Sequence, residues 1–432
     1  MTADNPSMLR TPNEASATSK VIFVNRYFFP DQSATSQMLS DLSFGLAQRG
    51  FPVHILCSRQ LYNNARAGLM PLETINGVIV HRVWTTSFGR DRLSGRALDY
   101  LSFYLSSAWT LLKMLSRGDT VVAKTDPPLI SIVAMAAAKV KGAHLMNWLQ
   151  DIFPEVASRL GNNPLPRWID QFVRKLRDST LRGADRNIVL GERVREFLAR
   201  SGIPAANICV IENWADRDAG PPKTAADSAL RAAFGLAGKF VVGYSGNLDR
   251  AHDFETLLDA ASLLSEDRDI VFLMIGGGAG MIALRQAVIH RGLENFQFLP
   301  HQPRASLLDS LAAADVHWVS LVPALEGLIV PRKLYGILAS ARPVIFIGDQ
   351  DGEIARLIGP AHAGVAVAVG DARELKRQIA ELKSDCGRRE SMGWNGYRLY
   401  IDNFTLQRAL ARWADILRSP DTLEPLNSEA DA

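Results

Sequence analysis

The sequence has few cysteines and no long apolar run, and each absence excludes a class of protein. Cys57, Cys209 and Cys386 lack the paired spacing of a disulfide framework or a zinc site, so we expect a reducing compartment. The longest mainly apolar stretch, Leu129 to Ala138 with one serine, has ten residues, about half of what a membrane-spanning helix needs. The polar start, residues 1–19, lacks the apolar core of a signal peptide and predicts a disordered tail. Together these absences predict a cytoplasmic protein.

Two other common signatures are missing. Gly276-Gly277-Gly278 follows a predicted strand, but the glycine spacing of the dinucleotide fingerprint is absent. The chain also shows no repeat of short fixed period, which excludes solenoids and propellers. What remains is an ordinary globular composition, with 47% apolar and 22% charged residues. A chain of 432 residues with this composition is expected to form two domains of roughly 200 residues each.

The charge is distributed unevenly between the two halves. Residues 1–215 carry 25 Lys and Arg against 17 Asp and Glu, or +8, and residues 216–432 carry 23 against 28, or −5. A basic half beside an acidic half indicates that the first half meets an anionic surface. A chance imbalance of solvated side chains is the alternative.

Strands and helices alternate in both halves. A strand at 20–27, a helix at 34–48 and a strand at 53–57 form a βαβ unit, which implies a parallel sheet. A second series begins at the strand 240–248. We therefore predict an α/β protein with two doubly wound, Rossmann-like domains facing across a cleft. The predicted parts are a tail at 1–19, a first domain at 20–215, a linker at 216–230, a second domain at 231–395, a C-terminal helix at 396–418 that packs back on the first domain, and a tail at 419–432.

The stretch from Asp315 to Phe346 carries the clearest predicted binding site. A short strand leads into the loop Glu326-Gly327-Leu328 and then into Pro331-Arg332-Lys333, with a helix from Leu334 to about Ala341. Pro331 suits a first helical turn, so the loop brings backbone N–H groups, Arg332 and Lys333 to one place. This arrangement favours a phosphate. The alternative is a surface loop with solvated cations.

Polar residues also follow other predicted strands, where open α/β sheets hold ligands. Gly246, Asn247 and Arg250 end one strand of the second half, and His301 and Gln302 follow another. In the first half, Asp151 follows the strand 144–149. Asp151 either contacts a ligand or caps the next helix.

Two helices of the first half have unusual composition. Arg90, Arg92 and Arg96 lead into an aromatic-rich helix that extends to Arg117, and the helix Arg167 to Arg182 is basic and amphipathic. The aromatic-rich helix is either buried in the core or lies on an anionic lipid surface.

Six short segments resemble the GT-B glycosyltransferases of family 4, in particular the bacterial cell-surface polysaccharide branch with the colanic acid and aminodeoxysugar transferases. The resemblance covers about residues 20–415. The segments are Phe29-Pro30-Asp31 with Ala34-Thr35-Ser36, Trp148-Leu149-Gln150-Asp151 with Pro154-Glu155, Tyr244-Ser245-Gly246-Asn247-Leu248, Gly276-Gly277-Gly278, Pro331-Arg332-Lys333-Leu334-Tyr335-Gly336, and Arg342-Pro343-Val344.

The resemblance implies a retaining transfer of sugar from a nucleotide-diphospho-sugar to a saccharide acceptor linked to polyprenyl diphosphate, without a metal ion or other cofactor and without nucleic acid. It implies that the second domain holds the donor and the first holds the acceptor. The implied catalytic residues are Lys333, Arg250, Asp151 and Glu326, and the implied donor-binding residues are Gly246, Asn247, Gly277, His301, Gln302 and Arg332. The enzyme would then work in the cytoplasm or at the inner face of the membrane.

The sequence departs from the family at three positions. Leu328 and Gly336 stand where many members have two glutamates, and Gln150 stands where a histidine is common. Glu326 lies two positions away and could replace the first glutamate. Two other functions stay open. One is a GT-B sugar-nucleotide epimerase, which requires an acid–base pair such as Asp151 and Glu326. The other is a non-catalytic subunit of a polysaccharide complex.

Overall fold

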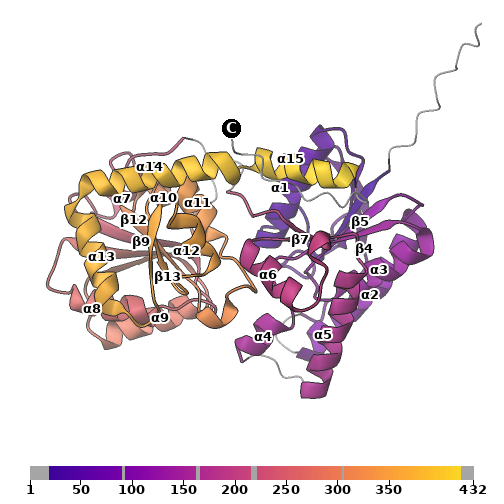
Figure 1. Cartoon of the computed structure of the whole chain (residues 1–432), viewed down its shortest axis with the longest axis horizontal. Coiled ribbons are helices and arrows are strands. Elements are labelled where there is room, and N and C mark those ends of the chain that lie inside the picture. The colour runs from indigo at the N-terminus through magenta and orange to yellow at the C-terminus, as the bar shows by residue number, and fades with distance from the viewer. Residues whose placement is uncertain (1–18, 90–92, 162–165, 216–220, 304–305, 420–432) are drawn as a thin grey trace, which may run out of the picture.

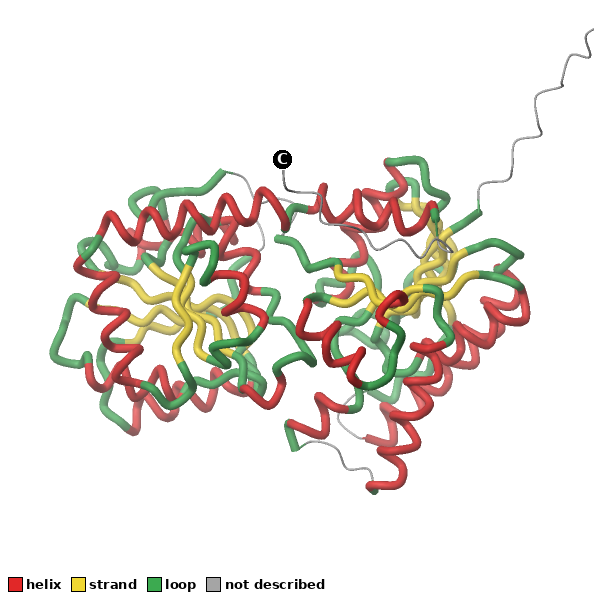
Figure 2. Tube along the Cα trace, viewed as in Figure 1, coloured by secondary structure: helices red, strands yellow, loops and turns green. Residues whose placement is uncertain are grey.

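The computed structural model describes residues 19–89, 93–161, 166–215, 221–303 and 306–419. Arg90, Arg92 and residues 216–220 of the predicted linker lie outside these ranges, as do the predicted tails except for residues 19 and 419. Within them the chain forms two α/β domains that lie side by side (Figure 1). Each has a sheet between layers of helices (Figure 2). The predicted fold class is confirmed.

The first domain is built on one mostly parallel sheet with strand order β3-β4-β2-β1-β5-β6-β7-β8. Alternate residues of β1 enter different cores: Val21 and Phe23 pack under α1, while Ile22 and Val24 pack under α2 and α3. Both faces are therefore buried, as expected for a parallel sheet. The strands are β1 (Val21–Val24), β2 (Val53–Ser58), β3 (Leu72–Ile75), β4 (Val78–Val83), β5 (Thr120–Lys124), β6 (His144–Trp148), β7 (Arg186–Val189) and β8 (Ile208–Val210). The helices are α1 (Ala34–Gln48), α2 (Leu93–Met114), α3 (Ile130–Lys141), α4 (Glu155–Arg159), α5 (Arg167–Arg182) and α6 (Glu192–Arg200).

The second domain has a parallel sheet with strand order β11-β10-β9-β12-β13-β14. The order reverses direction between β9 and β12, which is where ligands bind in open α/β sheets. The strands are β9 (Phe240–Asn247), β10 (Ile270–Gly277), β11 (Phe296–Leu299), β12 (Val316–Ser320), β13 (Val344–Ile347) and β14 (Gly364–Val367). The helices are α7 (Ala229–Ala233), α8 (Glu255–Leu263), α9 (Ala279–His290), α10 (Leu307–Ala312), α11 (Lys333–Ala339), α12 (Glu353–Ile358) and α13 (Ala372–Ser384). Helix α7 begins inside the predicted linker.

The edge of the first sheet differs from the expected all-parallel arrangement. Strand β3 pairs with β4 antiparallel, in register Ile75 to Val78. The turn between them is Asn76-Gly77, and both residues have positive φ, 49° and 82°. Asn-Gly is the preferred pair for such a two-residue hairpin turn. A local turn signal therefore adds this strand to the sheet.

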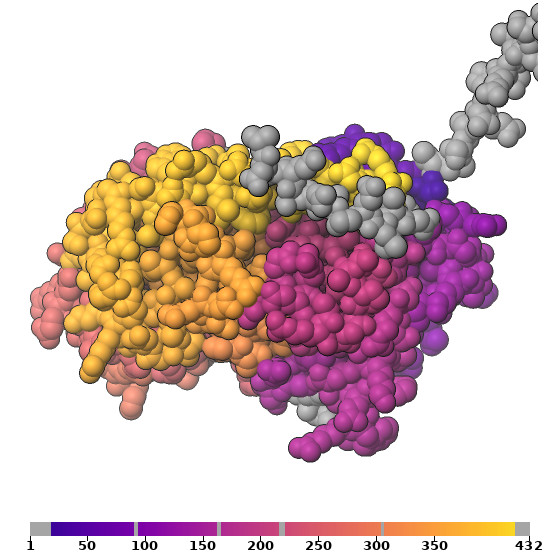
Figure 3. Space-filling model, viewed as in Figure 1, coloured from indigo at the N-terminus to yellow at the C-terminus, as the bar shows by residue number. Residues whose placement is uncertain are grey.

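The C-terminal segment forms two helices, where the sequence predicted one helix over 396–418. Helix α14 (Cys386–Asn403) packs on α11 of the second domain, and α15 (Leu406–Arg418) packs on α1 of the first. The break falls where the buried Phe404 contacts Tyr335 and the Thr405 side chain caps α15 by accepting from the N–H of Arg408. The two helices thus extend across both domains (Figure 3).

One cluster of buried apolar side chains extends across both domains. It includes Ile152 and Val194 of the first domain and Leu325 and Leu328 of the second. The N–H of Ile152 donates to the carbonyl of Leu328 at 3.1 Å. Direct packing, and not only the chain connection, therefore holds the domains together.

Helix α2 is apolar on two opposite sides, which neither predicted alternative anticipated. Phe103 and Leu111 are buried and face the sheet. An exposed stripe lies on the other side and consists of Leu98, Leu101, Leu105, Trp109 and Leu112, from 37% to 64% exposed. These positions follow the helical period, so they lie on one face. The helix belongs to the core on one side only. None of the helices in the described ranges is long and apolar enough to cross a membrane.

Candidate functional site

Lys333 is the centre of a group of side chains at the carboxyl edge of the second sheet. It is the first residue of α11, and its Nζ lies 3.0 Å from Nε2 of His252 and 5.0 Å from the centre of the Tyr244 ring. The Lys333 side chain packs against the backbone of Gly246, so closely that a Cβ atom at Gly246 would come within 2.9 Å of Cε of Lys333. Since φ of Gly246 is +128°, glycine is required there on conformational grounds too.

Burial changes the protonation of this pair. It lowers the pKa of Lys333 to about 8, with Asp249 acting in the opposite direction. Burial and the nearby Lys333 charge lower the pKa of His252 to about 4. At neutral pH the site therefore holds a partly buried ammonium beside a neutral imidazole. Such a charge in a low-dielectric surrounding favours an anionic ligand.

Glycines bring two strands and a loop unusually close at this edge. Gly276 pairs with Gly246 across β9 and β10, and a Cβ atom at Gly276 would lie 2.1 Å from the Gly246 carbonyl oxygen. Gly277 lies under His301, whose Nε2 is 3.0 Å from Oδ1 of Asn247. The structure thus places five predicted donor-site residues together: Gly246, Asn247, Gly277, His301 and Lys333.

The other predicted donor residues lie nearby but differ in direction. Arg250 is exposed on the loop after β9, and the side-chain amide of Gln302 donates to the carbonyl of Pro300 at 3.0 Å. Arg332 turns toward the first domain, where its Nη1 donates to the Ala34 carbonyl at 3.4 Å. The sequence neighbours Arg332 and Lys333 therefore make different contacts, and Lys333 is the one of these two that lies against Gly246.

Asp151 lies on the first domain where it meets the second. It forms an isolated antiparallel bridge with Ile329. Burial raises the pKa of its carboxyl group, and a hydrogen bond with the Thr125 side chain acts in the opposite direction. Helix α4 has Pro154 as its N-cap residue, so Asp151 is not the predicted cap. Gln150 beside it donates to Oδ1 of Asn213 at 3.4 Å.

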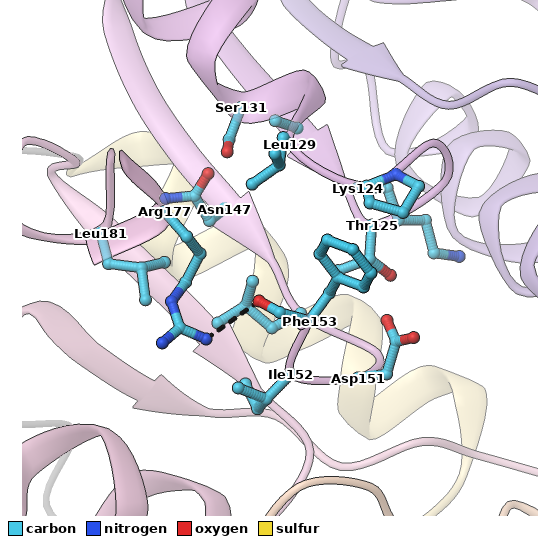
Figure 4. A pocket seen from close by; sticks show the side chains of 13 residues that line it. Lys124, Thr125, Leu129, Ser131, Asn147, Asp151, Ile152, Phe153, Arg177 and Leu181 are labelled. Atoms are coloured by element: carbon cyan, nitrogen blue, oxygen red, sulfur yellow. Dashed lines mark hydrogen bonds between the residues drawn. The ribbon is translucent and has the colours of Figure 1, made fainter. Parts of the chain in front are cut away.

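A cavity of about 30 Å³ lies behind Asp151, which is room for one or two water molecules and not for a sugar. In Figure 4, Thr125 and Asp151 lie on one side of it, opposite Arg177 and Leu181. Lys124, which also lines it, donates to the carbonyl of Thr35 at 2.6 Å and lies 4.0 Å from the Trp148 ring centre. Burial and the nearby Arg332 hold the pKa of Lys124 well below its usual range.

Glu326 makes a capping contact that the resemblance did not suggest. Its Oε1 accepts from the N–H of Glu353 at 2.7 Å, so its carboxylate caps α12. Glu353 in turn accepts with Oε2 from the N–H of Arg193 at 2.7 Å, at the start of α6 in the other domain. Burial raises the pKa of both carboxyl groups. The contact between Glu353 and Arg193 joins the two domains.

Sequence reasoning assigned no role to His252 or Lys124. His252 lies in a segment recognised as a ligand loop, but only the folded chain shows that its ring reaches Lys333. Lys124 is the last residue of β5, and its place at the carboxyl end of a parallel strand is a signal that could have identified it, since polar residues at that edge face ligands in this fold. Both residues therefore became visible as neighbours of the predicted site only in the folded chain.

Comparisons with known proteins agree with this geometry. A glycosyl transferase 4-like domain matches residues 34–214, and a glycosyl transferases group 1 domain matches residues 239–385. The glycosyltransferase WbjE of Pseudomonas aeruginosa is 25% identical over 293 residues, which is 68% of this chain and 73% of WbjE. The colanic acid biosynthesis glycosyl transferase WcaI of Escherichia coli is 27% identical over 281 residues, 63% of this chain and 68% of WcaI.

Solved structures share the fold over nearly the whole chain. Sucrose-phosphate synthase of Thermosynechococcus elongatus superposes with a TM-score of 0.74 at 16% identity, covering 93% of this chain and 98% of that one. HepE of Anabaena, in complex with UDP-glucose, superposes with a TM-score of 0.69 at 17% identity. The match covers 93% of this chain and 99% of HepE. The chain therefore belongs to the GT-B glycosyltransferases of family 4.

Proposed function

We propose that this glycosyltransferase moves a sugar from a nucleotide-diphospho-sugar to a saccharide acceptor in the biosynthesis of a cell-surface polysaccharide, with retention at the anomeric carbon. The observation that carries the proposal is the Lys333 ammonium, partly buried beside Gly246 at the carboxyl edge of the second sheet. The glycine contacts leave the backbone free to approach a diphosphate closely. HepE, which shares the fold, has been captured with UDP and with UDP-glucose. WcaI is named for colanic acid biosynthesis.

In the proposed reaction, electrostatic stabilisation of the leaving group drives the transfer. The bond between the anomeric carbon and the diphosphate oxygen breaks, and the acceptor hydroxyl oxygen bonds to that carbon from the same face. The hydroxyl proton moves to the departing diphosphate. Lys333 neutralises the charge that develops on the diphosphate, and Asp151 orients the acceptor hydroxyl from the first domain. The donor is a substrate, and the reaction uses no other cofactor.

A panel of nucleotides tests the donor assignment. We expect one of UDP, GDP, ADP, dTDP or CDP to raise the melting temperature, because a ligand at a hundred times its Kd adds about 2.7 kcal/mol to the free energy of unfolding. In a protein of this size that corresponds to several degrees. Transfer of radiolabelled sugar to the membrane fraction of the source cells would then follow the same nucleotide. If no nucleotide in the panel changes the melting temperature or binds in calorimetry, the donor assignment is wrong.

The exposed stripe of α2 supports a second part of the proposal, that the first domain rests on a membrane while it reaches a polyprenyl-diphosphate-linked acceptor. Trp84 and Phe88, which precede α2, are 63% and 66% exposed and extend the apolar surface. Lys113 lies 4.4 Å from the Trp109 ring centre, and residues 1–215 carry a net +8. An apolar face with basic residues beside it fits the surface of an anionic bilayer. Figure 1 shows α2 on the side of the first domain away from the second.

Vesicle co-sedimentation tests the membrane contact. We expect the protein to pellet with phosphatidylglycerol vesicles and much less with phosphatidylcholine vesicles, because each basic residue near an anionic leaflet contributes about 1 kcal/mol. Binding should weaken in 1 M salt, where the Debye length falls to about 3 Å. The double variant Leu105→Ser, Trp109→Ser should lower the affinity at least tenfold, since a buried apolar side chain contributes about 1.5–3 kcal/mol.

The matched control is Ile282→Ser with Ile289→Ser on α9, where both side chains are more than 60% exposed on the other domain. It should bind vesicles like the unmodified protein. Replacing Arg90, Arg92 and Arg96 by glutamine should reduce the salt-sensitive part of the binding. Equal pelleting with both lipids would contradict the electrostatic part. Unchanged binding of the double variant would show that the stripe does not meet the bilayer.

A further inference from the structure

His252 makes two contacts that together fix its protonation and its direction. Its Nδ1 lies 2.6 Å from the carbonyl oxygen of Ser320 at the end of β12, and its Nε2 lies 3.0 Å from Nζ of Lys333. A carbonyl oxygen only accepts, so Nδ1 carries the proton. The unprotonated Nε2 then accepts a hydrogen bond from the Lys333 ammonium. A protonated ring would instead place an N–H against that ammonium.

Two charged side chains of the described residues act on Lys333 from nearby, one carboxylate and one cation. Asp249, on the loop after β9, attracts the Lys333 charge, and Arg332, next to Lys333, repels it. The Tyr244 ring packs under both, with its centre 6.2 Å from that of His252. Within the described residues, no carboxylate forms an ion pair with Lys333 within 4.0 Å. Lys333 is therefore held by a neutral group, and its charge stays available.

We propose that His252 is a positioning residue that holds the Lys333 ammonium over Gly246 without neutralising it, so that the full charge meets the donor diphosphate. This inference rests on the proposed function of the site. A carboxylate at the same place would hold Lys333 equally well but would compete with the diphosphate for it. A neutral acceptor avoids this competition. A histidine at this position thus holds the Lys333 side chain in place and leaves its charge available to an anion.

Two variants with opposite charge consequences test the proposal. In His252→Asp, the new carboxylate should raise the pKa of Lys333 by more than one unit from its value of about 8 and should weaken UDP binding at pH 7 at least tenfold. In His252→Gln, the amide oxygen supplies a neutral acceptor in place of Nε2, so the pKa of Lys333 should stay within about half a unit, and the UDP affinity within about threefold, of the values of the unmodified protein. The pKa of Lys333 is measured without ligand, by competitive acetylation over pH 6.5–10 and mass spectrometry of the Lys333 peptide. UDP affinity is measured by calorimetry.

The two readouts separate this inference from the donor assignment. In the unmodified protein, UDP binding should weaken as the pH rises through about 8, because the ammonium loses its proton there, and Lys333→Ala should abolish that dependence. If the unmodified protein binds neither UDP nor pyrophosphate, the donor assignment fails, while acetylation still reports whether His252 controls Lys333. If both variants leave the Lys333 titration unchanged, or if His252→Asp binds UDP as tightly as the unmodified protein does, His252 does not have the positioning role.

Discussion

Replacing Lys333 by alanine is expected to lower the rate of sugar transfer by a factor of about one hundred or more, which corresponds to about 3 kcal/mol of transition-state stabilisation. The reason is that Lys333 is the cation that faces the glycine-lined edge formed by Gly246 and Gly276. The negative charge of the departing diphosphate would then develop in a partly buried site without compensation. The measurement is kcat/KM with the donor that the nucleotide panel identifies.

The control is Lys376→Ala on α13, an exposed lysine of the same domain, which should transfer sugar at the unmodified rate. The Lys333→Ala protein should melt at nearly the same temperature as the unmodified protein, because Lys333 forms no ion pair with a carboxylate in the described part of the chain. Transfer by Lys333→Ala within a few-fold of the control would show that another group stabilises the leaving diphosphate.

Replacing Trp413 by alanine should destabilise the first domain by about 3–5 kcal/mol, the usual range for a buried aromatic side chain. Trp413 of α15 is fully buried, and its ring centre lies 5.1 Å from that of Trp148 and 5.9 Å from that of Phe23. Its removal leaves a cavity between α15 and the central strands β1 and β6. Guanidinium unfolding followed by circular dichroism should show an earlier transition.

Trp394→Ala on α14 is the matched control, since this side chain is 54% exposed and should change the free energy of unfolding by less than about 1 kcal/mol. The two tryptophans differ mainly in burial, so their comparison isolates packing. If Trp413→Ala lowers the free energy of unfolding no more than the control does, α15 is only loosely attached to the first domain.

The sequence was most informative where local patterns decide the structure. The apolar period of 34–48 predicted α1 with its observed ends, and the glycines after two strands predicted the edge where Lys333 lies. The Asn76-Gly77 turn was an equally local signal, but the strand before it is short and half exposed, with burial alternating along Leu72–Ile75. Such an alternating pattern predicts a strand less clearly than the continuous apolar runs of the buried strands do.

Contacts between distant residues account for what the sequence could not show. Glu326 and Glu353 are 27 residues apart, and Glu353 lies 160 residues from Arg193. No periodicity encodes such pairs, so the capping role of Glu326 became visible only in the fold. The same holds for His252 and Lys333, which are 81 residues apart. For the α2 stripe, composition could not distinguish one apolar face from two.

Helix α15 also has a consequence for synthesis of the protein. Its buried residues Leu410, Trp413 and Leu417 belong to the same core as Phe23 and Trp148 of the first domain. During translation, which proceeds from the N-terminus at about 5–20 residues per second, the strands of that core emerge first and its last helix emerges at the end. The first domain therefore cannot complete its core on the ribosome before the second domain has been made. The apolar surface of α1 stays uncovered until α15 has been synthesised. A chain that stopped before Leu406 would therefore expose this surface to chaperones.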